Sequence, residues 1–114
     1  MKIMMRILFS VFFAIAIGVH IYYIFESDKQ PLWWHMIYFV TYGVCWWMIF
    51  SKNKNRTLIY AVMSLFPFFT HVYYAVQHSR NFDADFWVCL LVCVILPMGF
   101  LWMRYESATE TLEQ

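Results

Sequence analysis

Four long apolar runs, separated by short polar segments, set the pattern of this chain. The runs cover residues 3–25, 32–50, 58–77 and 86–103. Each has about the 20 residues that a helix needs to cross a hydrocarbon core of roughly 30 Å. Because the connections are short, consecutive helices are expected to run antiparallel. The pattern predicts an all-α integral membrane protein, an antiparallel bundle of four transmembrane helices.

A polar stripe marks the third run. Its members recur at spacings of three and four residues and are Tyr60, Ser64, Pro67, His71, Tyr74 and His78. Such spacings place residues on one face of a helix. A polar stripe on an apolar helix should turn toward other helices or a cavity, away from lipid. We therefore expect the other helices to pack around this face.

The composition of the chain indicates a single membrane-embedded domain. Hydrophobic residues make up 63% of the sequence and charged residues 13%, compared with roughly 25% charged residues in soluble domains. We expect residues 1–105 to form the transmembrane domain and residues 106–114 a polar cytoplasmic tail. The net charge of +1 gives no basis for a nucleic-acid partner.

Lysine and arginine predict the orientation. Six of the eight basic residues flank one side of the predicted bundle: Lys2, Arg6, Lys52, Lys54, Arg56 and Arg104. Only Lys29 and Arg80 lie on the other side. The positive-inside rule then places both termini in the cytoplasm (N-in/C-in). All six tryptophans lie near the ends of the predicted helices, as in an aromatic belt. The small size and the lack of an organelle signal suit a bacterial inner (plasma) membrane.

The candidate chemistry gathers in the outer half of the predicted bundle, where all four histidines lie. The second run repeats the stripe pattern with His35, Tyr38 and Tyr42. If these faces meet, they enclose an outward-facing pocket between the helices. Its predicted lining is His71, Tyr74, His35, Tyr38, Tyr42, His20 and Tyr23. Aromatic walls with a few polar groups suit a lipid-like or other apolar small molecule with a polar head.

A haem or metal site is a less favoured hypothesis. His20 and His71 each begin a His-x-Tyr-Tyr sequence, and two imidazoles on facing helices can hold a haem. The sequence lacks CxxCH and the close His, Cys or Met spacing typical of copper and zinc sites. We therefore predict no cofactor and no metal site as the leading interpretation.

A third hypothesis makes the chain a non-catalytic accessory or assembly subunit, packed on a larger membrane protein partner or on copies of itself. The sequence contains neither GxSxG nor HExxH, and no pair of carboxylates lies within the runs, so it leaves enzymatic activity open.

Smaller features predict local packing. Ser10, Ala14 and Gly18 form a ridge of small residues that favours a close helix contact. The three cysteines lie within apolar runs and are expected to behave as small buried hydrophobic residues. Pro67 is expected to bend the third helix and to release the carbonyl of Met63 from its helical bond.

Overall fold

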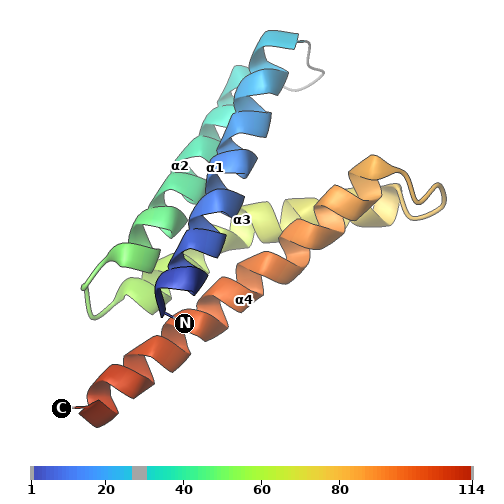
Figure 1. Ribbon diagram of the computed structural model, residues 1–114. Helices are drawn as coiled ribbons and strands as arrows, with labels where there is room; N and C mark the ends of the chain where they lie inside the picture. The colour runs from blue at the N-terminus through green and yellow to red at the C-terminus, as the bar shows by residue number, and fades with distance from the viewer. Residues whose placement is uncertain (1, 27–30, 114) are drawn as a thin grey trace. The chain divides into compact units, whose positions relative to one another are not determined.

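The fold is built from helices throughout the described part of the chain. A computed structural model describes residues 2–26 and 31–113. Its helices are α1 (Lys2–Glu26), α2 (Leu32–Phe50), α3 (Arg56–Gln77) and α4 (Ala84–Glu113) (Figure 1). Four helices in an all-α chain were predicted from the apolar runs, and this prediction is confirmed. The fourth helix runs ten residues past its predicted end, from residue 103 to residue 113.

Three helices are long and apolar enough to cross a membrane: α1, α3 and α4. The remaining helix, α2, has 19 residues and contains no Lys, Arg, Asp or Glu. Its mean hydropathy is lower because Trp, Tyr and His carry polar atoms on large apolar rings. Such residues suit the interface between lipid and water.

The chain divides into two compact units, Met1–Met63 and Ser64–Gln114. The first unit contains α1, α2 and the first turns of α3, and the second contains the rest of α3 and α4. The division falls within α3, next to Pro67. Proline has no N–H to donate to the carbonyl four residues earlier, at Met63. Each unit is described by itself below, and the antiparallel four-helix bundle stays a prediction.

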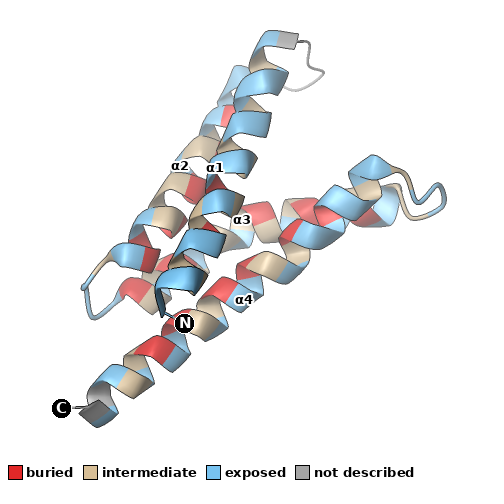
Figure 2. Cartoon of the chain, in the orientation of Figure 1, coloured by how far each residue is buried: buried red, intermediate tan, exposed pale blue. Residues whose placement is uncertain are grey.

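In the first unit, α1 and α2 lie side by side along their length. The buried residues of α2 recur every three or four positions, which gives the helix one buried stripe (Figure 2). The stripe consists of His35, Tyr38, Thr41, Tyr42, Cys45, Met48 and Ile49. Phe9 and Phe13 of α1 are also buried. The Phe13 ring meets those of Tyr42 and Tyr60 at centroid distances of 6.1 and 6.4 Å.

One predicted helix contact forms only in part. Ser10 accepts a hydrogen bond of 3.0 Å from the indole N–H of Trp46. Ala14 is exposed, and a Cβ added at Gly18 would meet nothing within 4 Å. Among the described residues of the first unit, Ser10 is therefore the one member of the ridge for which a contact with α2 is seen.

The ends of α2 are set by local chemistry. Pro31 precedes the helix in an extended conformation (φ −70°, ψ 159°), which a residue just before the first turn can adopt. At the other end, the guanidinium of Arg56 donates to the carbonyl oxygens of Ile49 and Ser51 at 3.3 and 3.4 Å. A cation at a helix C-terminus satisfies carbonyls that lack helical partners. Arg56 was counted as a loop charge from the sequence, yet it is buried.

Candidate functional site

Four of the seven predicted site residues come together between α1 and α2. They are His20 on α1 and His35, Tyr38 and Tyr42 on α2. Because the two helices are antiparallel neighbours, residues equally far from the connecting turn face one another. His20 lies seven residues before the connection of residues 27–30, and His35 lies five residues after it. The register of the α1–α2 hairpin therefore brings these four groups together.

The two histidines make direct contact. The Nδ1 atoms of His20 and His35 are 3.3 Å apart, and the ring centroids are 5.5 Å apart with the planes tilted by 53°. Two imidazole nitrogens at this separation form a hydrogen bond only if one carries a proton and the other presents a lone pair. A hydrogen bond at this distance therefore needs the two facing nitrogens to take opposite roles, one as donor and one as acceptor.

An aromatic column continues from this pair into the hairpin. The His20 ring stacks on Tyr38 with centroids 4.2 Å apart and planes 15° from parallel. Tyr38 in turn stacks on Tyr42 at 5.8 Å and 22°. Trp34 meets the Tyr38 ring edge-on at 6.0 Å. The Tyr38 ring contacts one face of the His20 imidazole, and His35 bonds to one edge of it. Together these two contacts fix the orientation of His20.

Burial is uneven across this group. His35, Tyr38 and Tyr42 keep only 4%, 2% and 1% of their surface exposed, whereas His20 is half-buried. A molecule approaching the group from outside would therefore meet His20 first. The buried members hold His20 in place, and His20 presents the accessible polar edge.

The other three predicted site residues are Tyr23 in the first unit and His71 and Tyr74 in the second. His71 and Tyr74 belong to the second unit, where Nδ1 of His71 lies 2.6 Å from the carbonyl oxygen of Pro67 in its own helix. At that distance Nδ1 donates its proton to the carbonyl. Tyr23 is exposed and pairs edge-on with its neighbour Tyr22 at 5.8 Å. A pocket uniting all seven residues, and a haem between His20 and His71, stay predictions.

A shallow apolar groove lies at the opposite end of α1. It has a volume of about 330 Å³ and is lined by Ile3, Arg6, Ile7, Ser10, Val11 and Phe50. The Arg6 guanidinium carbon lies 5.6 Å from the centroid of the Phe50 ring. No histidine lines this groove, which lies toward the other end of α1 from the His20–His35 pair.

Comparisons with known proteins add no assignment. No family model matches the chain, and neither the curated proteins nor the solved structures provide a match. The chemistry of the His20–His35 group is therefore argued from its geometry. Imidazoles can donate to a carbonyl oxygen or accept from a hydroxyl, and the stacked tyrosine rings provide an apolar wall beside them.

Proposed function

We propose that this chain is an integral membrane protein in which all four helices cross the bilayer and both termini lie in the cytoplasm. Support comes from the three long apolar helices and from the absence of charged residues in α2. The excess of Lys and Arg on one side supports the orientation. The same pattern of basic residues is the one expected in a bacterial inner membrane.

The proposed activity is the binding of a lipid-like or other apolar small molecule whose head carries a carbonyl or hydroxyl group. The observation that carries this proposal is the His20–His35 contact of 3.3 Å, with His20 stacked on Tyr38. Polar groups held inside an apolar helix pair are costly unless they are satisfied. Ionisable residues within transmembrane segments mark functional sites more often than elsewhere.

The proposed pose follows from the uneven burial. The head group would bond to the half-buried His20, while His35 and Tyr38 keep the imidazole oriented. The apolar part of the molecule would extend along α1, whose outward side chains are large and apolar, among them Ile15, Val19 and Tyr22. A preorganised polar group beside an apolar surface is the usual design of sites for such ligands.

The test is to measure which apolar compounds stay bound to the purified protein. The wild-type chain and a His20→Phe variant are extracted from membranes in mild detergent, and the bound compounds are quantified by organic extraction and mass spectrometry. Phenylalanine keeps the stack on Tyr38 and removes both ring nitrogens. We expect a near-stoichiometric compound in the wild type and at least a tenfold loss in the variant.

A matched variant separates this site from the groove at the other end of α1. Val11→Trp places a large side chain in the groove and leaves the histidines intact. We expect Val11→Trp to retain the compound. Loss in Val11→Trp with retention in His20→Phe would move the site to the groove and overturn the proposal. A wild-type protein that carries no compound, but co-purifies with a stoichiometric protein partner, would favour an accessory subunit instead.

A further inference from the structure

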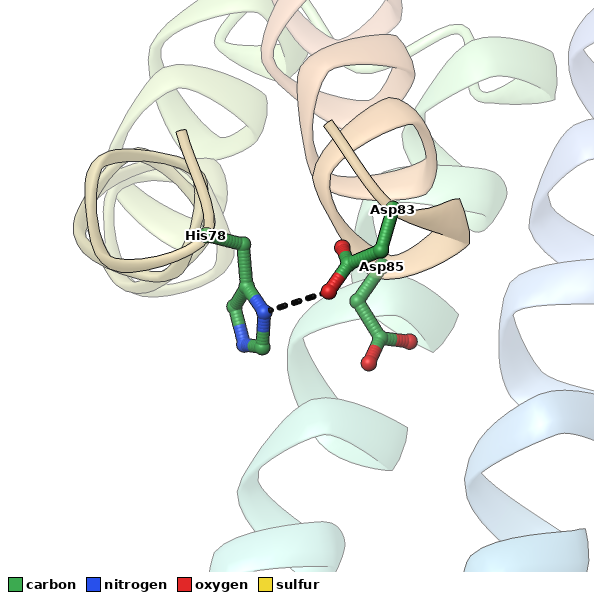
Figure 3. A group of neighbouring side chains, drawn as sticks. All are labelled: His78, Asp83 and Asp85. Atoms are coloured by element: carbon green, nitrogen blue, oxygen red, sulfur yellow. Dashed lines mark hydrogen bonds and ion pairs between the residues drawn. The ribbon is translucent and has the colours of Figure 1, made fainter. Parts of the chain in front are cut away.

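The turn between α3 and α4 holds a second group of polar side chains, separate from the site proposed above. His78 follows the last residue of α3, Asp83 immediately precedes α4, and Asp85 lies in the first turn of α4. Figure 3 shows the imidazole and the two carboxylates turned toward the same space. One ligand atom from each residue lies within 4.8 Å of the other two.

The backbone of the turn is what brings these residues together. The N–H groups of Asn81 and Phe82 donate to the carbonyl of His78 at 3.2 and 3.3 Å. Phe82 adopts a left-handed conformation with φ of 46°, which is costly for a residue with a large side chain. The indole N–H of Trp87 donates to the Phe82 carbonyl at 3.1 Å. The turn is therefore bonded at both ends, and it returns the chain so that Asp83 faces His78.

Asp83 uses its two oxygens differently. Oδ1 accepts a hydrogen bond of 2.9 Å from the N–H of Phe86, as a residue capping a helix N-terminus does. Oδ2 lies 3.1 Å from Nδ1 of His78. The bond from Phe86, with the contact to His78, holds the pKa of the Asp83 carboxyl below its ordinary value. The capping bond leaves Oδ2 directed at the space that His78 and Asp85 share.

We propose that His78, Asp83 and Asp85 form a binding site for a divalent zinc ion. The set offers one imidazole nitrogen and two carboxylate oxygens, all of which are zinc ligands. Calcium and magnesium prefer sites made only of oxygen, so the imidazole selects for a transition metal. Two carboxylates balance the charge of the ion.

The distances allow the site to close on an ion. Ligands bound to zinc at about 2.0–2.1 Å in a tetrahedron lie about 3.3–3.4 Å from one another. The 3.1 Å separation of His78 and Asp83 is already close to this value. Asp85 is exposed, so rotation of its side chain can bring its carboxylate nearer. Three protein ligands leave a fourth position for water or for a molecule delivered to the ion.

A simpler role for these residues is closure of the turn, and Asp85 separates the two roles. The bond between His78 and Asp83 and the cap on Phe86 suffice to hold the turn. Asp85 makes neither bond, so a purely structural cluster does not need it. A zinc site with three protein ligands does need it.

The experiment is a zinc titration of the whole chain in detergent, in which calorimetry measures the binding. The variants are Asp85→Asn, which keeps the size of the side chain, and Glu110→Gln, which removes an exposed carboxylate of α4 outside the cluster. We expect one zinc ion per wild-type chain, affinity at least tenfold weaker in Asp85→Asn, and unchanged affinity in Glu110→Gln. X-ray absorption of the zinc complex should show one imidazole ligand.

Three results would overturn the proposal. Equal zinc affinity in the wild type and in Asp85→Asn would show that Asp85 is no ligand. Zinc binding that survives Asp85→Asn but is lost in His20→Phe would assign the ion to the His20–His35 pair. A wild-type chain that binds no zinc at millimolar concentration would also contradict it.

Discussion

Two histidine groups in this protein have opposite surroundings. His20 and His35 meet each other within a pair of apolar helices and are walled by tyrosine rings. His78 lies on a turn and meets two carboxylates. Under the two proposals, the same side chain serves different partners: a neutral polar head on an apolar molecule in the first group, and a cation in the second. Neighbouring residues, and not the histidine alone, decide which chemistry each group supports.

The largest effect on stability is expected when the Tyr38 ring, which stacks between His20 and Tyr42, is removed. Tyr38→Ala removes a fully buried ring that contacts both His20 and Tyr42. Truncation of a buried aromatic residue costs about 3–5 kcal/mol of unfolding free energy, because it leaves a cavity. The melting temperature in detergent should be much lower for this variant than for the wild type. Tyr73→Ala, at an exposed position of α3, should change stability by less than about 0.5 kcal/mol. Similar losses in the two variants would contradict the buried column.

A smaller effect on stability is expected when His20 of the His20–His35 pair is replaced by a residue without ring nitrogens. His20→Phe keeps the ring stack but removes the bond to the buried His35. Loss of one partner of a buried hydrogen bond costs about 1–3 kcal/mol. His78→Phe, on the turn, should destabilise the protein by much less, because His78 and Asp83 both contact solvent. Chemical denaturation of the two variants measures the difference. If His78→Phe lowers the free energy of unfolding more than His20→Phe does, the comparison between buried and exposed groups is wrong.

The smallest effect concerns pH at the turn. The folded protein holds the pKa of Asp83 below its ordinary value, chiefly through the Phe86 N–H. The ionised carboxylate therefore adds stability above the ordinary value of about 3.9, and this contribution disappears as pH falls through the lower folded pKa. The melting temperature of the wild type should fall more steeply below about pH 4 than that of Asp83→Asn. Parallel curves for the two proteins would show that the carboxylate is not stabilised by folding.

Much of the fold follows from simple patterns in the sequence. The apolar runs predicted the four helices, and the spacing of His35, Tyr38 and Tyr42 predicted the buried face of α2. Helix α4 exceeds its predicted length because Glu106, Ala108 and Glu110 are good helix formers and need no apolar face to stay helical. A drop in hydropathy marks the end of an apolar segment, but the helix can continue beyond that point.

The sites were harder to predict. The shared His-x-Tyr-Tyr sequence directed attention to His20 and His71, whereas the register of the α1–α2 hairpin pairs His20 with His35. Counting residues outward from the 27–30 connection would have brought His35 within two residues of the position opposite His20. His78 was placed in the outer half of the predicted bundle, but its convergence with Asp83 and Asp85 depends on the left-handed backbone at Phe82. A single-residue conformation of that kind leaves no periodic signal.

The pairing of α1 with α2 has a consequence for biosynthesis. Both helices, the His20–His35 contact and the Ser10–Trp46 bond are complete within the first 50 residues. Domains generally form from the N-terminus as the chain emerges from the ribosome. Under the proposed membrane assignment, this hairpin can enter the bilayer as one piece before α3 and α4 have been synthesised. Its polar rings would then be shielded from lipid at the moment of insertion, without help from the rest of the chain.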